Sequence, residues 1–110
     1  MIKVFVSSPY TKGDMVKNLN DHFKISNKLI DLGFAPFVPL LYHYLEIHQI
    51  RDYDVWLDID LEWLKQSDIM LRLPGESSGA EMEEKIANMS GIPVFYNIED
   101  LLNYSEQQKL

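Results

Sequence analysis

Short apolar runs alternate along the chain with longer segments in which apolar residues recur every three or four positions. The short runs are rich in β-branched and aromatic residues and predict strands, at residues 2–6, within 34–41, at 69–73 and at 92–96. The longer segments have the helical period and predict helices, at residues 14–32, 52–66, between Ser78 and Gly91, and at 98–108. Strands and helices therefore alternate, with short connections.

This alternation predicts a parallel sheet with helices on both faces, because each crossover helix packs back onto the sheet that it connects. We expect an α/β fold, a three-layer sandwich of the flavodoxin-like or Rossmann-like type with a sheet of four parallel strands, or five at most. Residues 1–110 are expected to form one single domain, since the chain contains no linker, internal repeat or low-complexity stretch.

Individual residues refine these boundaries. Ser78, followed by Glu81 three residues later, predicts a capping box at the start of the third helix. Pro36 and Pro39 limit the second strand to a short piece with prolines at its ends or on a sheet edge. Residues 41–51, rich in aromatic side chains and histidines, are predicted to form a loop.

Ligands of open parallel sheets bind beyond the carboxyl ends of the strands, where the strand order reverses. Three predicted loops lie there, at residues 7–13, 41–51 and 74–79. Any site is expected among them.

Composition narrows the classes of function. The chain has 17 acidic and 10 basic residues and a net charge of −7, the wrong sign for neutralising the phosphates of a nucleic-acid polymer. It has no cysteine, which excludes disulfides, thiolate nucleophiles and cysteine-based metal sites. It also has no apolar run approaching ~18 residues and no signal-peptide pattern. We expect a soluble, cytoplasmic protein without a membrane partner.

Two acidic residues break the helical pattern by falling on apolar faces. Glu83 lies three residues after Ala80 and four before Ala87, and Asp60 lies four residues after Trp56. Burying an unpaired carboxylate costs several kcal/mol, so a small domain is not expected to carry two without a reason. The predicted helices that carry Glu83 and Asp60 flank the third strand, so the two carboxylates can meet.

Each of these acids also fits a purely structural role. Glu83 can be a helix-start acid stabilised by the dipole or an ion-pair partner at an oligomer interface. Asp60 can accept hydrogen bonds from a neighbouring loop. His43 and His48 lie five residues apart, a poor match to metal-ligand spacing, and single hydrogen-bonding roles are favoured. With no dinucleotide fingerprint or P-loop in the sequence, we expect neither a cofactor nor a metal.

A carboxylate near a helix start in a poorly solvated pocket is suited to attack an electrophilic carbon or to stabilise a developing cation. At the anomeric carbon of a sugar, a second acid then controls the proton of the leaving group. Glu83 and Asp60 fit this division of work. The loops at 7–10 and 77–79 add hydroxyls and helix-start N–H groups that can hold a sugar hydroxyl or a phosphate.

The segments around these carboxylates resemble the nucleoside 2-deoxyribosyltransferase superfamily, which includes deoxynucleoside-monophosphate N-hydrolases and small, often phage-encoded relatives. The matching segments are VSSPY at 6–10, DLEWLKQSD at 60–68 and SSGAEME at 77–83, and the resemblance covers most of residues 2–96. It implies that Glu83 forms a covalent deoxyribosyl intermediate. It also implies that Asp60 contacts the sugar and helps to place the nucleophile or move a proton.

The predicted catalytic residues are thus Glu83 and Asp60. The residues predicted to bind substrate are Ser8, Pro9, Tyr10, His43, Ser77 and Gly79.

We therefore predict an enzyme that cleaves or transfers at the N-glycosidic bond of a 2′-deoxynucleoside or its 5′-monophosphate. The alternative is a non-catalytic module that binds or senses a nucleotide, which the short chain and Lys85, where the family often has Gly, motivate. A structural oligomerisation domain is a third interpretation. A homodimer or higher homo-oligomer is expected because the core is small and the aromatic region 42–56 exposes apolar surface.

Overall fold

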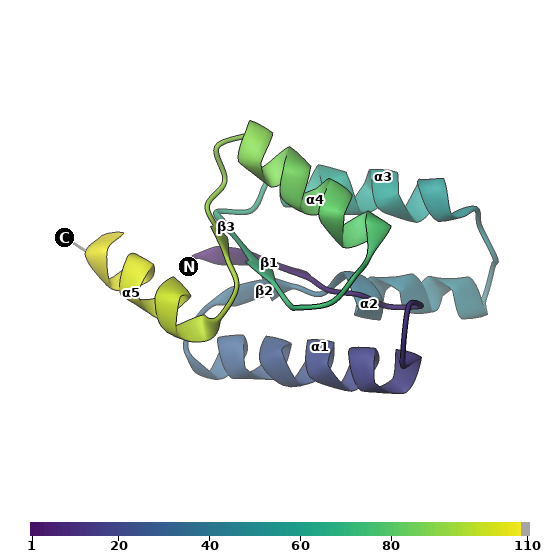
Figure 1. The fold of residues 1–110 in the computed structure, drawn as a ribbon, viewed down its shortest axis with the longest axis horizontal. Helices are drawn as coiled ribbons and strands as arrows, with labels where there is room; N and C mark the ends of the chain where they lie inside the picture. The colour runs from purple at the N-terminus through teal and green to yellow at the C-terminus, as the bar shows by residue number, and fades with distance from the viewer. Residues whose placement is uncertain (109–110) are drawn as a thin grey trace.

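The computed structural model describes residues 1–108, which form a four-stranded, fully parallel sheet with the order β2-β1-β3-β4 (Figure 1). The strands are β1 (Lys3–Ser7), β2 (Ala35–Phe37), β3 (Ile69–Arg72) and β4 (Val94–Phe95). Ser7 and Arg72 are register partners at the carboxyl ends of the two central strands. The chain order reverses at β1, so the site expected at a topological switch point lies beyond β1 and β3.

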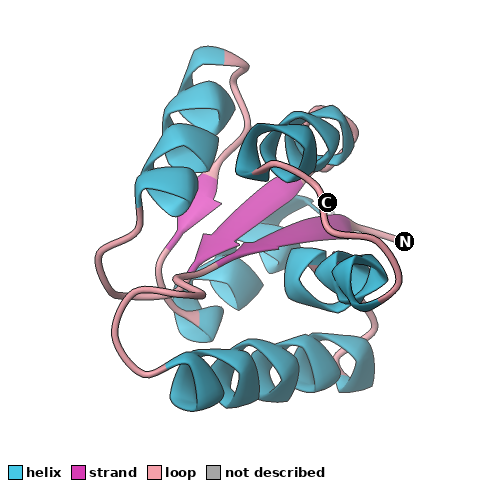
Figure 2. Ribbon diagram, turned by 90° about the vertical axis from the view of Figure 1, so that its right-hand side faces the viewer, coloured by secondary structure: helices cyan, strands magenta, loops and turns pink. Residues whose placement is uncertain are grey.

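Helices cover both faces of this sheet (Figure 2). The helices are α1 (Met15–Asp31), α2 (Pro39–Tyr42), the 3-10 helix η1 (His43–Ile47), α3 (Tyr53–Leu64), α4 (Ser78–Met89) and α5 (Ile98–Gln108). Helices α1 and α5 supply the core on one face, whereas α3 and α4 supply it on the other. The predicted three-layer α/β sandwich with four strands is confirmed.

Strand alternation sorts the two cores. Val4 and Val6 of β1 join the core beneath α1 and α5, whereas Phe5 joins the core beneath α3 and α4. Because successive strand residues point to opposite faces, Ser7 follows Phe5 toward α4. The buried polar side chain of Ser7, at the end of β1, therefore lies on the same face of the sheet as α3 and α4.

Residues 39–47 depart from the prediction. A short helix and a 3-10 helix stand where the sequence suggested the end of a strand and a loop. Pro39 occupies the first helical position, where its fixed φ favours a helix and its missing N–H is not needed. Pro36 remains in a strand because β2 is an edge strand that pairs only with β1.

The start of α4 is also corrected. Ser77, not Ser78, is the N-cap, and its Oγ accepts a hydrogen bond from the Ala80 N–H at 3.1 Å. The extended backbone of Ser77 starts the helix one residue earlier than predicted. Glu81 is then the fourth helical residue rather than the third, so the predicted capping box is wrong. Among residues 1–108, none of the helices combines the length and the apolar character needed to cross a membrane.

Candidate active site

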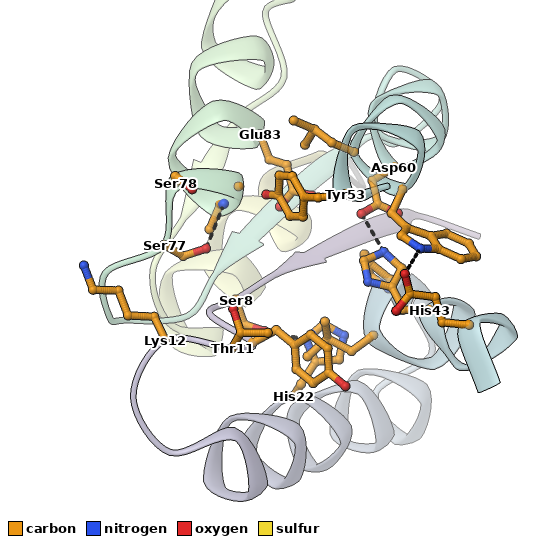
Figure 3. Close-up of a pocket in the computed structure, with 18 of the residues that line it drawn as sticks. Ser8, Thr11, Lys12, His22, His43, Tyr53, Asp60, Ser77, Ser78 and Glu83 are labelled. Carbon is orange, nitrogen blue, oxygen red and sulfur yellow. Dashed lines mark hydrogen bonds and ion pairs between the residues drawn. The ribbon is translucent and has the colours of Figure 1, made fainter. Parts of the chain in front are cut away.

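A cavity of about 670 Å³ opens beyond the carboxyl ends of the central strands, between the loop after β1, η1, α3 and the start of α4 (Figure 3). The cavity is lined by seven of the residues that the sequence singled out, namely Ser8, Tyr10, His43, Asp60, Ser77, Gly79 and Glu83. Side chains that are distant along the chain therefore face one space.

Pro9 does not line this cavity. Its ring packs under Gly75, where a β-carbon would approach Pro9 Cγ to 2.8 Å, and it borders a separate hollow beside α1. A proline restricts the residue before it to extended backbone, and neighbouring side chains of an extended segment point to opposite sides. Ser8 therefore faces the cavity while Pro9 faces away.

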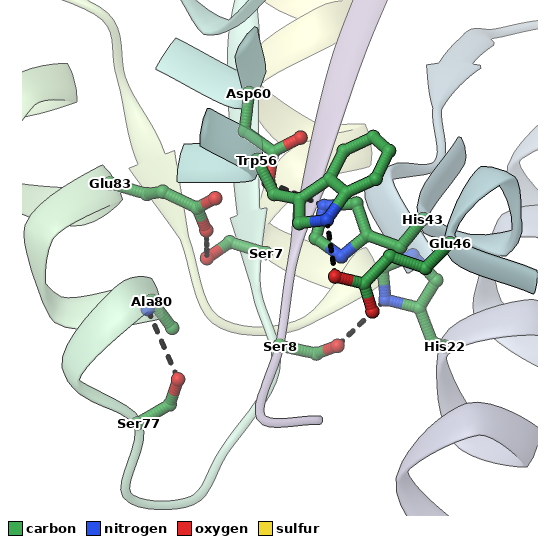
Figure 4. Close-up of polar contacts among 10 residues, drawn as sticks. All are labelled: Ser7, Ser8, His22, His43, Glu46, Trp56, Asp60, Ser77, Ala80 and Glu83. Atoms are coloured by element: carbon green, nitrogen blue, oxygen red, sulfur yellow. Dashed lines mark hydrogen bonds and ion pairs between the residues drawn. The ribbon is translucent and has the colours of Figure 1, made fainter. Parts of the chain in front are cut away.

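Glu83 is buried on the inner face of α4, with 6% of its surface exposed. The Ser7 hydroxyl donates a hydrogen bond to Glu83 Oε1 at 2.7 Å (Figure 4). Burial, and to a smaller extent the charge of Asp60, raise the pKa of Glu83, whereas the Ser7 hydrogen bond and Arg72 lower it; the net pKa is about 8. Glu83, predicted to lie on an apolar helix face, is thus a buried carboxyl group that holds its proton tightly.

Asp60 lies across the cavity on α3 and is 3% exposed. Its Oδ2 is 2.9 Å from Nε2 of His43, which η1 supplies, and its Oδ1 has no hydrogen-bond partner among the described residues. Burial raises the pKa of Asp60, and the hydrogen bond from His43 opposes that effect. Asp60 therefore has the structural role that the sequence allowed, because its Oδ2 is hydrogen-bonded to a neighbouring segment. Its Oδ1 remains without a partner among the described residues.

The indole ring of Trp56 packs against the imidazole ring of His43. Its ring lies 5.3 Å from the Trp56 ring, centroid to centroid, and the Trp56 Nε1–H donates to Glu46 Oε1 at 2.7 Å. Trp56 is one turn before Asp60 on the same face of α3. The hydrogen bond to Glu46 satisfies the buried indole N–H, so the Trp56 ring can hold the His43 ring against Asp60.

Sequence reasoning missed Tyr53, which crosses the cavity from the start of α3 to the start of α4 (Figure 3). Its pKa is raised by burial first and then by Glu83 and Asp60, and the nearby Ser78 side chain opposes that rise. A β-carbon at Gly79 would overlap the Tyr53 hydroxyl, so glycine is needed for this approach. Tyr53 lies seven residues before Asp60 and thus on the same helical face, which is the signal that could have found it.

His22 was missed as well. It is 1% exposed on the inner face of α1, and its Nδ1 lies 2.7 Å from Ser8 Oγ. Burial lowers the pKa of His22 to about 3, and His43 contributes in the same direction. A lone histidine within a helical pattern gave no sign of this contact.

Lys12 and Arg72, two cations near the site, make different contacts. Lys12 lines the cavity, and its Nζ lies 2.6 Å from Glu76 Oε2. Arg72 donates hydrogen bonds to the carbonyls of Leu73 and Gly75, the latter at 2.8 Å. Arg72 therefore stabilises the turn after β3. Among residues 1–108, no group of three His, Cys, Asp or Glu side chains is placed to hold a metal ion.

Comparison with family models places residues 2–97 in a family described as a domain of unknown function, DUF7768. The chain belongs to this family. No curated protein matches the sequence.

A solved structure that resembles the chain is the 2-deoxyribosyltransferase from the psychrotolerant bacterium Bacillus psychrosaccharolyticus. The two agree with a TM-score of 0.69 at 24% identity, over 84% of this chain and 69% of that one. At this identity the likeness establishes the fold, a deoxyribosyltransferase-like α/β sandwich.

Proposed function

We propose that this protein cleaves or transfers at the N-glycosidic bond of a 2′-deoxynucleoside or its 5′-monophosphate, with residues 1–110 as one deoxyribosyltransferase-like domain. The observation that carries the proposal is the pair of buried carboxylates, Glu83 and Asp60, on one cavity beyond the carboxyl ends of β1 and β3. The fold shared with a 2-deoxyribosyltransferase supports it.

In the first step, ionised Glu83 attacks C1′ of the deoxyribose while the bond from C1′ to the base nitrogen breaks. The electron pair of that bond leaves with the base, and a proton from the carboxyl group of Asp60 neutralises it. The product is a deoxyribosyl ester of Glu83 and a free base. Burial favours the protonated form of Asp60 that this step needs.

In the second step, the oxygen of water or the nitrogen of a second base attacks C1′ and takes over the sugar. Asp60, now ionised, accepts the proton of the incoming group, and the Glu83 carboxylate leaves. Two inversions at C1′ give overall retention. His43, at 2.9 Å from Asp60, keeps that carboxyl group oriented in both steps.

The remaining cavity residues have binding roles in this proposal. Ser8 and Tyr10 come from the loop after β1 and contact the sugar side. Ser77 and Gly79 place the start of α4 at the cavity, where unpaired N–H groups attract oxygen atoms of a ligand. Lys12 is a cation available to a 5′-phosphate, in exchange for its contact with Glu76.

A nucleotide-binding module without turnover is the second candidate function. It is favoured by the pKa of about 8 of Glu83, because a carboxyl group that is protonated at neutral pH is a poor nucleophile. Lys85, the residue that motivated this alternative, is exposed on the outer side of α4 and leaves the cavity unobstructed.

Product analysis separates the two. The protein is incubated with each deoxynucleoside and each 5′-monophosphate, and free base is measured by chromatography, with and without a labelled second base. We expect base release or exchange from the parent and from Glu81→Gln, an exposed carboxylate on the same helix, and none from Glu83→Gln. Equal turnover by Glu83→Gln contradicts the mechanism. Calorimetric binding without product favours the binding module.

We also propose that a second copy of the chain covers the exposed apolar side chains of residues 41–55. Ile47 is 85% exposed and Ile50 is 87% exposed, and Leu45 and Tyr44 lie beside them on η1. Such a patch is unusual on a monomer. Sedimentation at micromolar concentration tests this, and a species at the chain mass of 12.9 kDa contradicts it.

A further inference from the structure

Ser8 and His22 form a polar pair on the side of the cavity opposite the carboxylates (Figure 4). Ser8 Oγ and His22 Nδ1 are 2.7 Å apart, and both residues line the cavity. Ser8 follows the end of β1, whereas His22 projects from α1 and is 1% exposed. The packing of α1 therefore fixes the imidazole ring against the serine hydroxyl.

The second ring nitrogen decides which partner donates. His22 Nε2 is buried and has no hydrogen-bond partner among the described residues. If Nδ1 accepted from Ser8, the proton of the neutral ring would sit on Nε2 as a buried N–H without an acceptor. If Nδ1 carries the proton, Nε2 is only an under-used acceptor. Orphaned buried N–H groups are the rarer of the two in proteins, so the second arrangement is favoured.

In that arrangement His22 Nδ1–H donates to Ser8 Oγ. A serine hydroxyl has one hydrogen, and Ser8 Oγ has no other side-chain partner in the described part of the chain. The hydroxyl hydrogen is then left for the cavity. Across the cavity, Glu83 and Asp60 present oxygens that accept hydrogen bonds.

We propose that His22 is a positioning residue that acts through Ser8, holding the serine hydroxyl as a fixed hydrogen-bond donor to an acceptor oxygen of the ligand. The cavity then recognises a hydroxylated, sugar-like ligand from two sides: the carboxylates accept from its hydroxyls, and Ser8 donates to one of its oxygens. This rests on the proposed function only for the choice of a deoxynucleoside as the probe ligand.

A nucleophilic role for Ser8 is the obvious competing idea, because serine beside histidine is a familiar arrangement. A nucleophilic serine needs a base that accepts its proton. Burial lowers the pKa of His22 to about 3, which makes it a weak base. The pair is therefore suited to orient the hydroxyl rather than to ionise it.

Nitrogen NMR of the ¹⁵N-labelled protein tests the arrangement without any ligand. The ring signals of His22 are assigned from their absence in His22→Asn. We expect Nδ1 to carry the proton and Nε2 to show the shift of an unprotonated nitrogen. A proton on Nε2 overturns the proposal.

Binding of a deoxynucleoside, measured by calorimetry, tests the consequence. Because a lost hydrogen bond to a ligand typically weakens binding several-fold, we expect Ser8→Ala and His22→Leu each to raise Kd about tenfold, and the double variant to raise it no further. His22→Asn, whose amide places a donor near the position of Nδ1, should stay within about threefold of the parent.

Full binding by His22→Leu together with weak binding by Ser8→Ala overturns the proposal, as do effects that multiply in the double variant. If His22→Leu does not fold, the His22→Asn affinity and the nitrogen shifts still decide. A parent protein that binds no deoxynucleoside refutes the proposed function instead, and the nitrogen shifts alone then decide the role of His22.

Discussion

Replacing Glu83 by glutamine is expected to stabilise the folded protein at neutral and alkaline pH and to lower its stability in mild acid. Glu83 is buried, and its neighbours leave its pKa at about 8, against 4.5 for an ordinary glutamate. Glutamine has the same shape, can still accept the Ser7 hydrogen bond, and never ionises. The variant therefore removes the cost of carrying a charge in this cavity.

The size of the effect follows from the two pKa values. The folded chain binds the proton of Glu83 more tightly than the unfolded chain, so this group stabilises the fold fully below 4.5, and the advantage is lost as pH rises through 8. Relative to its value below pH 4.5, the free energy of unfolding is then lower by about 3 kcal/mol at pH 7 and by about 5 kcal/mol well above pH 8 because of this one group. Because the glutamine N–H₂ group needs a partner of its own, we expect a net gain of about 2 kcal/mol at pH 8.

Urea unfolding followed by circular dichroism measures this, for the parent and Glu83→Gln at a series of values between about pH 4 and pH 9. Glu81→Gln is the matched control, because Glu81 is exposed in the first turn of the same helix and favours the helix dipole. The Glu81→Gln variant should have a slightly lower free energy of unfolding than the parent. A Glu83→Gln gain that is equal at all pH values, or a loss at pH 8, refutes the reasoning.

Three further predictions follow from the site and the caps. The kcat/KM of base release should pass through a maximum as pH is varied, because the attack needs ionised Glu83 while departure of the base needs protonated Asp60; a profile that is flat from about pH 6 to pH 9 contradicts this. Gly79→Ala should displace the Tyr53 side chain and weaken deoxynucleoside binding about fivefold, with the thermal midpoint nearly unchanged, since the hydroxyl end of Tyr53 can swing away. Unchanged affinity by calorimetry speaks against a role for Tyr53. Asp14→Ala should cost about 1 kcal/mol, because Asp14 Oδ1 caps α1 by accepting the Lys17 N–H at 3.1 Å. In thermal unfolding, Asp14→Asn should keep the parent midpoint, and an equal loss in both variants rules out the cap.

The sequence was sufficient for the architecture, because the signals that specify it are local. Short apolar runs indicated strands and a period of 3.6 residues indicated helices, and their alternation allowed essentially one layered, parallel arrangement. The last helix, residues 98–108, has the predicted bounds. Errors fell at residues 39–47 and at Ser77, where a proline and two adjacent serines each permit more than one local structure.

The same local rules found the two inward carboxylates, because a residue on an apolar helix face must lie inside once the helix packs. Helical period alone placed Glu83 and Asp60 there, and the structure buries both. Their catalytic roles remain predictions that the product analysis tests.

Only the tertiary structure decided what each carboxylate contacts. Ser7 reaches Glu83 across 76 residues of sequence, and His43 reaches Asp60 across 17. These pairings depend on the register of β1 against β3 and on how closely η1 packs on α3, which no local propensity encodes. The raised pKa values follow from the same packing, since desolvation is set by everything that surrounds a group. The sequence by itself therefore determined which acids lie inside, and the tertiary structure determined how they are held and how tightly they keep their protons.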